Sequence, residues 1–297
     1  MRILLLGKNG QVGWELQRSL APLGELIALD RQRINGLCGD LSDLGSLRAT
    51  IRQVKPDVIV NAAAYTAVDK AESEPELATR VNTLASQVMA EEALSLDAWL
   101  IHYSTDYVFS GCGQMPWQED DLVAPVNHYG ASKLAGEQAI AASNCKHLIF
   151  RTSWVYGARG NNFAKTMLRL AKDRETLSVI ADQIGAPTGA DLIADVTALA
   201  IQKIVEHPEL GGVYHLAAAG EVSWHGYASY VIEFARSHGE ELAVTVIDPI
   251  DTAAYPTPAC RPLNSRLNTQ KLQDNFSLRL PDWQSGVIRM LMEVLKK

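Results

Sequence analysis

The sequence predicts an α/β fold built on one doubly wound parallel sheet, and three observations support this prediction. Apolar runs of strand length alternate with longer helical patterns, as expected for parallel strands joined by right-handed crossovers. The chain has 297 residues, enough for one large α/β unit or for a sheet domain with a smaller lobe. After Arg151 the pattern becomes less regular, and no linker or repeat interrupts it. We therefore expect a smaller C-terminal lobe, interwoven with the sheet, that closes over its carboxyl edge.

The individual elements follow from this pattern in chain order. Strands are expected at Arg2–Leu6, Leu26–Asp30, Val58–Asn61, Trp99–Ser104 and Leu148–Arg151, with helices between them at Val12–Leu20, Leu44–Val54, Glu76–Leu96 and Tyr129–Ala142. Beyond them we expect helices at Asn162–Lys172, Leu192–Val205, Trp224–Ser237 and Pro281–Leu295, and short strands at Leu177–Ala181 and Val213–Leu216. The segment Pro249–Pro262 contains four prolines and is expected to be a loop. Residues 1–154 should form mainly the sheet domain and 155–297 mainly the second lobe, with the region Leu192–Leu216 returning to the sheet domain.

Composition excludes several classes of protein. The formal net charge of −7 provides no basic surface for nucleic acid, and no apolar run approaches the ~20 residues that span a bilayer. The opening apolar run is too short for a signal peptide, so we expect an interior strand of a cytoplasmic protein. The four cysteines lie far apart without a Cys-x-x-Cys pair, which favours structural thiols over a metal site.

A glycine-rich turn directly follows the first expected strand and opens a helix. Glycines let the backbone approach a pyrophosphate, and the free N–H groups of the helix N-terminus receive it. The spacing is Gly-x-x-Gly-x-x-Gly, which departs from the commoner Gly-x-Gly-x-x-Gly and points to the short-chain dehydrogenase/reductase variant of the Rossmann-type fold. We expect this turn to bind the cofactor NADH or NADPH through Gly7, Asn9, Gly10, Gln11, Val12 and Gly13.

The choice between the two cofactors depends on the end of the second strand. Asp30 is placed there to accept both adenosine ribose hydroxyls, and its carboxylate would repel a 2′-phosphate. Arg31 and Arg33 follow and could neutralise such a phosphate. The sequence therefore favours NAD but leaves NADP open.

Two further segments are expected at the cofactor. Asp40 and Leu41, after another short strand, suit a contact to the adenine amine and an apolar support under its ring, although Asp40 could instead cap a helix. The third strand ends in Ala62, Ala63 and Ala64, whose small side chains leave room for the cofactor to cross the sheet edge. Tight helix packing would also explain these alanines.

Thr105, Tyr129 and Lys133 are the candidate catalytic residues. Tyr129 and Lys133 stand four apart on an expected helix, so the ammonium can lie near the phenol and bring its pKa of about 10 toward the working pH. The strand Trp99–Ser104 stops at Thr105 and Asp106, and a hydroxyl there can donate to a substrate carbonyl beside the phenol. Lys133 could also bind the nicotinamide ribose. The Tyr-x-x-x-Lys pattern alone also arises on solvated helices, but the three elements occur in the right order for catalysis.

The whole chain resembles an extended short-chain dehydrogenase/reductase and, within that superfamily, the dTDP-4-dehydrorhamnose reductase family. Beyond the glycine turn and the candidate catalytic residues, the matching stretches are 61–72, 104–109, 151–156, 161–167, 185–188 and 261–266. The resemblance implies NAD(P)H-dependent reduction of the C4 ketone of dTDP-4-dehydro-L-rhamnose, in the synthesis of rhamnose precursors for cell-surface polysaccharides. It assigns Asp106 and Trp154 to the sugar, where an indole face suits the apolar face of a pyranose. Arg261 and Arg266 are plausible partners of the diphosphate, or are simply solvated.

The resemblance also raises the question of a metal ion. Some bacterial members of the family are thought to join two subunits through Mg²⁺, and the matching acids here are Glu15, Asp191 and Glu293. The middle position is Asp where relatives carry Glu, so its reach is shorter. Carboxylates suit Mg²⁺, yet exposed acids on helices are usually only solvated. Two alternatives are therefore open: a homodimer with Mg²⁺ at its interface, or three acidic side chains that are simply solvated.

Two rival classes of function stay open: another enzyme of the same superfamily and a non-catalytic subunit. An epimerase or another nucleotide-sugar 4-ketoreductase of the superfamily would share most of these residues. A 4,6-dehydratase would carry an acid directly after Thr105-Asp106, where this chain has Tyr107. A non-catalytic NAD(P)-binding regulatory subunit would not need an intact set of Thr105, Tyr129 and Lys133.

Overall fold

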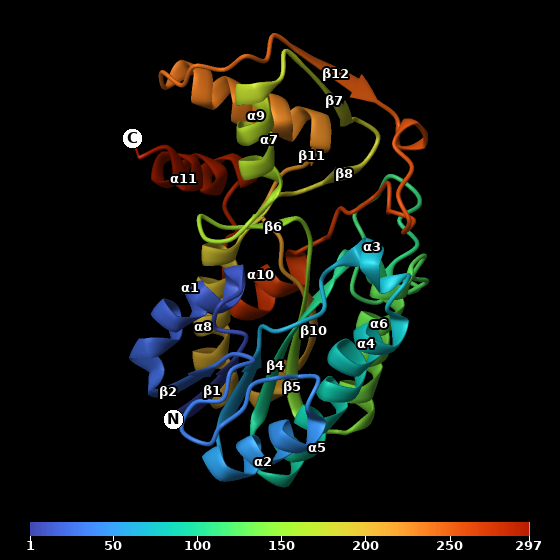
Figure 1. The fold of residues 1–297 in the computed structure, drawn as a ribbon. Coiled ribbons are helices and arrows are strands. Elements are labelled where there is room, and N and C mark those ends of the chain that lie inside the picture. The colour runs from blue at the N-terminus through green and yellow to red at the C-terminus, as the bar shows by residue number, and fades with distance from the viewer. Residues whose placement is uncertain (297) are drawn as a thin grey trace.

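The computed structural model describes residues 1–296 and contains a six-stranded, all-parallel sheet (Figure 1). Its order is β10-β5-β4-β3-β1-β2, which confirms the doubly wound sheet. The strands are β1 (Arg2–Leu6), β2 (Glu25–Leu29), β3 (Val58–Asn61), β4 (Trp99–Thr105), β5 (Lys146–Thr152) and β10 (Gly212–His215). Because the strand order reverses at β1, the carboxyl ends of β1 and β3 form the crevice where such sheets bind ligands.

Two helical layers cover the sheet. Ile3 and Leu5 of β1 face one layer, and Leu4 and Leu6 face the other, because side chains alternate along a strand. The first layer contains α1 (Gln11–Leu20), α8 (Ala190–Glu206) and α10 (Gln270–Phe276), and the second contains α2 (Leu44–Val54), α5 (Ala85–Ser95) and α6 (His128–Ala142). Full burial of each such leucine or isoleucine contributes about 1.5–3 kcal/mol.

The expected helix Glu76–Leu96 contains an irregularity. The short helices α3 (Val68–Ala71) and α4 (Pro75–Thr79) lead into a π-helical turn at Arg80–Leu84, and α5 continues from there. A π turn inserts into a helix without stopping its apolar pattern, so periodicity could not reveal it. The turn lies against α6 and helps to position that helix.

The remaining elements pack beyond the sheet, in the upper half of Figure 1. Helices α7 (Phe163–Asp173), α9 (Trp224–Ser237) and α11 (Trp283–Leu295) share a second apolar core. Strand β7 (Thr176–Ile180) pairs with β12 (Val246–Ile250), β6 (Val155–Tyr156) with β9 (Thr188–Gly189), and β8 (Ile184–Gly185) with β11 (Val222–Ser223). Four 3₁₀ turns complete the elements of residues 1–296: η1 (Ala21–Leu23), η3 (Asp106–Val108), η4 (Pro208–Leu210) and η5 (Thr252–Ala254).

Two local expectations were wrong. Pro249 lies in β12 rather than in a loop, since a strand of a two-stranded pair tolerates a proline on its open edge. No strand precedes Asp40, because residues 34 and 37 form only a single antiparallel bridge and Gly39 donates its N–H to the Asp30 carbonyl at 3.1 Å. Within residues 1–296, no helix is both long and apolar enough to cross a membrane, and all four cysteines are free.

Candidate functional site

A cavity of about 1100 Å³ opens at the carboxyl ends of β1, β3 and β4. Most of the expected site residues line it: Gly7, Asn9, Gly10, Gln11, Val12, Asp30, Arg31, Asp40, Leu41, Ala62, Ala63, Ala64, Thr105, Asp106, Tyr129, Lys133 and Trp154. Gly13, Arg261, Arg266 and the three acidic residues do not line it. The fold thus gathers segments from the entire first half of the chain around one space.

The glycine turn depends on two of its glycines for shape. Gly7 has φ +87°, and a Cβ there would lie 2.7 Å from the backbone nitrogen of Ala63. A Cβ on Gly13 would lie 2.0 Å from the Gly7 carbonyl oxygen, so helix α1 can close onto the turn only without a side chain. Gly10 precedes α1 without a side-chain cap, which leaves the first N–H groups of the helix available for an anion.

The adenosine end of the cavity is partly preorganised. Asp30 accepts hydrogen bonds from the Asn9 side chain and, at 2.8 Å, from the Gln32 backbone. Arg31 lines the cavity, whereas Arg33 pairs with Asp43 at 3.3 Å and does not line it. Only one of the two arginines is therefore in position to meet a 2′-phosphate.

Asp40 does not cap the following helix. Its carboxylate accepts from the Ser42 backbone at 2.9 Å and from the Ser42 hydroxyl at 2.8 Å, while Asp43 caps α2. Leu41 beside it is buried yet lines the cavity. The alternative role of Asp40 as a helix cap is thereby removed.

Helix α6 carries Tyr129 and Lys133, and glycines fix its position. Asn127 caps it by accepting from the Gly130 backbone at 2.8 Å. A Cβ on Gly130 would lie 2.2 Å from the Tyr107 carbonyl oxygen, and one on Gly136 would lie 2.4 Å from that of Asn82. The helix therefore packs directly against η3 and the π turn.

Asn82 is a structural support that sequence reasoning missed. Its Oδ1 accepts from the Tyr65 backbone at 2.8 Å, and its Nδ2 donates to the Ser132 hydroxyl at 3.0 Å. It ties the loop after β3 to the residue preceding Lys133. An asparagine in a helix interior, a place that disfavours it, was the only available signal.

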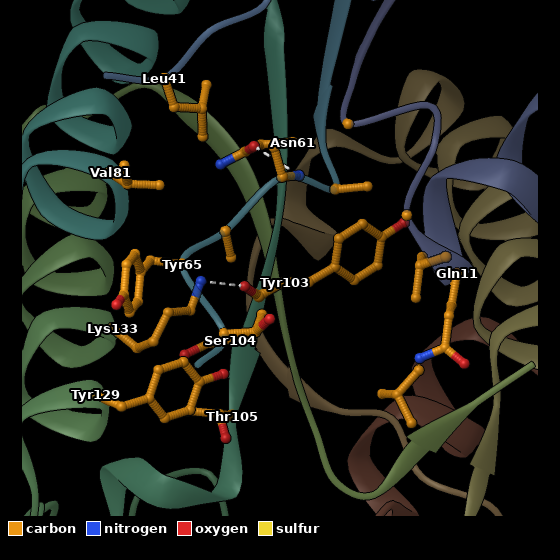
Figure 2. Close-up of a pocket in the computed structure, with 18 of the residues that line it drawn as sticks. Gln11, Leu41, Asn61, Tyr65, Val81, Tyr103, Ser104, Thr105, Tyr129 and Lys133 are labelled. Atoms are coloured by element: carbon orange, nitrogen blue, oxygen red, sulfur yellow. Dashed lines mark hydrogen bonds between the residues drawn. The ribbon is translucent and has the colours of Figure 1, made fainter. Parts of the chain in front are cut away.

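Lys133 points toward the backbone of β4 and away from the Tyr129 hydroxyl. Its Nζ lies 2.6 Å from the Tyr103 carbonyl oxygen and 3.1 Å from Nε2 of His102, and Figure 2 shows it directed at that carbonyl. Burial lowers the pKa of Lys133 to about 8, although the nearby Glu137 charge opposes this. Sequence reasoning missed His102, because a lone histidine in an apolar strand has no distinctive spacing.

Tyr129 is half-buried beside Thr105, as Figure 2 shows. Burial raises the pKa of Tyr129 above its usual value, and the hydrogen bond with Thr105 opposes that shift. The structure therefore does not show the expected lowering of the Tyr129 pKa by Lys133. The phenol is held as a neutral proton donor next to a hydroxyl, which is the state that general acid catalysis requires.

Thr105 and Asp106 form a buried pair at the end of β4. The Thr105 hydroxyl donates to Oδ1 of Asp106 at 3.1 Å and accepts from the Tyr107 backbone at 3.2 Å. Burial raises the pKa of Asp106 to about 7. Both side chains line the cavity beside Tyr129, so polar groups that could contact a substrate carbonyl and hydroxyl gather in one place.

Trp154 is held in a strained conformation at the cavity wall. Its φ is +49°, which is unfavourable for a bulky residue. Its indole stacks on that of Trp224, with ring centroids 3.5 Å apart, and a Cβ on Gly185 would lie 2.7 Å from its ring. Trp224 also lines the cavity but has no sequence motif of its own.

Arg261 and Arg266 are both paired with acids. Arg261 donates to Asp69 at 2.8 Å, and Arg266 donates to Glu221 at 2.6 Å. Neither arginine is therefore a freely solvated side chain, and neither lines the cavity. A diphosphate would have to compete with these carboxylates.

The three acids expected at a metal lie on α1, α8 and α11, but two of them already have cationic partners. Glu15 lies 3.5 Å from Arg18, and Asp191 lies 3.3 Å from Arg289. In the described part of the chain, no group of three acidic, histidine or cysteine side chains could hold a metal ion. A single chain therefore does not fit a Mg²⁺ site.

Comparison with known proteins places this geometry in a family. The sequence model of the RmlD substrate binding domain matches residues 1–296, and a dTDP-4-dehydrorhamnose reductase of Salmonella typhimurium is 60% identical over 294 residues, covering 99% of this chain and 98% of that protein. The chain belongs to the dTDP-4-dehydrorhamnose reductase family.

Solved structures of the dTDP-4-dehydrorhamnose reductase family have the same fold from end to end. A reductase of Clostridium acetobutylicum superposes with a TM-score of 0.88 at 34% identity, with full coverage of both chains. A reductase of Bacillus anthracis, solved in complex with NADP, superposes with a TM-score of 0.86 at 36% identity and covers 98% of this chain and 99% of its own. The family membership predicted from the sequence motifs is confirmed.

Proposed function

We propose that this protein reduces the C4 ketone of dTDP-4-dehydro-L-rhamnose to give dTDP-L-rhamnose, with NADH or NADPH as the reductant. The observation that carries the proposal is the meeting of Thr105, Tyr129 and Lys133 in the cavity that also contains the glycine turn. Its membership of the reductase family supports the choice of substrate. The product is a precursor of cell-surface polysaccharides.

The side chains divide the chemistry between them. Bound NAD(P)H supplies the hydride that C4 of the sugar receives. Tyr129 gives its proton to the developing C4 oxyanion, and general acid catalysis of this kind contributes ~10²–10⁴ in rate. Thr105 donates a hydrogen bond to the same oxygen, and Lys133 binds the nicotinamide ribose and supports the Tyr129 anion with its charge.

The cofactor and the nucleotide sugar bind mainly to different parts of the chain. Residues 1–154, with the region 192–216, bind the cofactor mainly, and the rest of residues 155–297 bind the nucleotide sugar. Gly7, Asn9, Gly10, Gln11, Val12, Gly13, Asp30, Arg31, Asp40, Leu41 and Ala62–Ala64 contact the cofactor, together with Tyr129 and Lys133. Asp106 and Trp154 position the sugar, and Arg261 and Arg266 receive its diphosphate after release from their acidic partners.

The rival functions make different demands on the cofactor. An epimerase or dehydratase returns the hydride within one turnover, whereas a reductase consumes one reduced cofactor for each product. Tyr107 occupies the position where a dehydratase would need an acid, which argues against elimination. A regulatory subunit would not need Tyr129 and Thr105 hydrogen-bonded in a buried site.

A cytoplasmic homodimer is the assembly that we propose. The helices α1, α8 and α11 share one surface, linked through Arg18–Asp195 at 2.7 Å and Arg289–Asp191. Mg²⁺ between two copies stays a prediction, because Glu15 and Asp191 would first have to leave their arginines. Light scattering with Mg²⁺ and with EDTA tests it, and an unchanged mass in both would reduce the three acids to solvated side chains.

The experiment for the catalytic proposal is a stoichiometric assay. The protein is incubated with dTDP-4-dehydro-L-rhamnose and either NADH or NADPH, and the loss of reduced cofactor is compared with the product identified by NMR. One reduced cofactor consumed for each dTDP-L-rhamnose formed supports the reductase. Conversion of the sugar without net consumption of cofactor would support an epimerase instead.

A further inference from the structure

A buried line of hydrogen-bonding groups runs beneath Lys133 across strands β3 and β4. Asn61 Oδ1 lies 3.2 Å from the Ala63 backbone nitrogen, and Asn61 Nδ2 lies 3.1 Å from Nδ1 of His102. Nε2 of His102 lies 3.1 Å from Lys133 Nζ, which lies 2.6 Å from the Tyr103 carbonyl oxygen. Asn61 and His102 face each other in register, and Asn61, His102 and Lys133 are at most 2% exposed.

The groups at the two ends of this line fix the direction in which its hydrogen bonds are donated. The backbone N–H of Ala63 can only donate, so Asn61 turns its oxygen to it and its NH₂ group to His102. Nδ1 of His102 must then accept, and a neutral imidazole that accepts at Nδ1 carries its proton on Nε2. That proton points at Lys133 Nζ. Lys133 can accept it only as a free amine, which still donates one of its own N–H groups to Tyr103.

Donation in the opposite direction would leave buried donors without acceptors in the protein interior. An ammonium at Lys133 needs a lone pair on Nε2, which puts the imidazole proton on Nδ1 and turns the Asn61 oxygen toward His102. The Asn61 NH₂ group would then face the Ala63 N–H, and two buried donors would lack acceptors. The charged form of Lys133 is therefore opposed by Asn61 through His102, in addition to the effect of burial on the lysine itself.

Other ionisable groups around Lys133 do not reverse this argument. The charge of Glu137 on α6 raises the pKa of Lys133, but Glu137 is paired with Arg151 of β5 at 2.7 Å. Tyr129 on α6 and Tyr107 in η3 stay protonated because burial raises the pKa of both. Asp106 is buried with a raised pKa, and burial alone, the largest cause, lowers the pKa of His102 below its usual range. An imidazolium at His102 is therefore excluded near neutral pH.

We propose that Asn61 and His102 are positioning residues that fix Lys133 Nζ against the Tyr103 carbonyl and favour its free-amine form before the cofactor binds. The inference rests on the proposed reductase function. During turnover Tyr129 loses a proton to the sugar oxygen, and it must regain one. Lys133 takes a proton from a solvent water molecule, whose O–H bond breaks to leave hydroxide in the solvent, and becomes an ammonium. An N–H bond of that ammonium then breaks as the Tyr129 O–H bond re-forms. The free amine is thereby restored, and no proton is gained or lost within the protein over the cycle.

The tautomer of His102 tests the proposal without substrate. In protein with ¹⁵N-labelled histidine, the protonated and unprotonated ring nitrogens give well-separated NMR signals, and His102→Gln assigns them by difference. At about pH 9, above the value of about 8 to which burial lowers the pKa of Lys133, we expect Nε2 of His102 to carry the proton in the protein without cofactor or substrate. A proton on Nδ1 of His102 under those conditions would overturn the proposal. Because the wild-type protein is measured, loss of folding in a variant does not affect this result.

The Asn61→Asp variant should reverse the direction of hydrogen-bond donation between residue 61 and His102. A carboxylate can only accept, so it should accept from both Ala63 and Nδ1 of His102, move the imidazole proton to Nδ1 and raise the pKa of Lys133 by about 1–3 units. The Lys133 titration is followed by the ¹³Cε signal, assigned with Lys133→Met. Asn275→Asp, which adds the same charge on α10, should move neither signal. A Lys133 titration that is the same in Asn61→Asp and wild type would contradict the proposal, whatever the activity of either protein.

Discussion

The indole of Trp154 lies flat on the indole of Trp224, with ring centroids 3.5 Å apart and planes inclined by 12°. Trp224 is itself held by a hydrogen bond from its Nε1 to Gln183 at 3.1 Å. The two rings thus form one wall of the cavity, and Trp154 keeps its left-handed backbone conformation within it. A sugar that packs on Trp154 therefore meets a supported ring.

Removing that support should weaken sugar binding. We expect Trp224→Leu to raise KM for the nucleotide sugar by about 2- to 10-fold, the equivalent of ~0.5–1.5 kcal/mol for an aromatic pair, with a smaller effect on kcat. Circular dichroism of the coupled indoles should be lost in the same variant. Phe234→Leu, which breaks the Phe234–His238 stack on the same helix, serves as the control. An unchanged KM in Trp224→Leu would remove Trp224 from the substrate site.

Tyr129→Phe should abolish most turnover and leave cofactor binding almost intact. The change deletes the transferable proton and little contact area, so we expect kcat to fall by about 10²–10⁴. Fluorescence titration with NADH measures binding separately. Tyr227→Phe is a matched control, because the buried Tyr227 hydroxyl has no hydrogen-bond partner among residues 1–296 and its loss should leave kcat unchanged. A Tyr129→Phe enzyme that retains more than about a tenth of the rate would show that another group supplies the proton.

Cofactor preference should respond in opposite directions to two neighbouring changes. Asp30→Ala removes the carboxylate that would repel a 2′-phosphate, so kcat/KM should shift toward NADPH. Arg31→Ala removes an arginine that lines the cavity, so it should shift the preference toward NADH. Arg33→Ala should have little effect, because that arginine pairs with Asp43. Preferences that stay the same in both the Asp30 and Arg31 variants would place this segment outside the cofactor site.

Asp106 should make the protein less stable as the pH rises. Burial raises its folded-state pKa from 3.8 to about 7, so the folded state binds the proton more tightly than the unfolded state. The resulting loss of stability is absent below about pH 4, grows between the two pKa values and is complete above pH 7, at on the order of 4 kcal/mol. In urea unfolding across this range, the stability of Asp106→Asn relative to wild type should rise by about that amount. A constant difference would contradict the raised pKa.

Some parts of this structure could be predicted from sequence because their signals are local. The bounds of β1, α2, β3 and α9 match the expected ranges, since apolar period and flanking turn residues define them. The glycine turn could also be predicted from the sequence. The backbone is so crowded at Gly7 and Gly13 that a side chain does not fit, and glycine is therefore required at these positions.

Other features depend on contacts between distant segments and produce no periodic pattern in the sequence. The π turn keeps its apolar pattern, the partners of Lys133 depend on the path of one long side chain, and Trp224 reaches Trp154 only through tertiary packing. The spacing of Tyr129 and Lys133 predicted their shared helix face but could not predict where the ammonium group would point.

Transfer of a labelled hydride tests the central claim most directly. The protein is given dTDP-4-dehydro-L-rhamnose and NADH or NADPH carrying deuterium at the transferable position of the nicotinamide, and the product is examined by NMR. The account predicts dTDP-L-rhamnose with deuterium at C4 of the sugar and one oxidised cofactor for each product. A product without deuterium at C4, or a sugar converted while the labelled cofactor remains reduced, would contradict it.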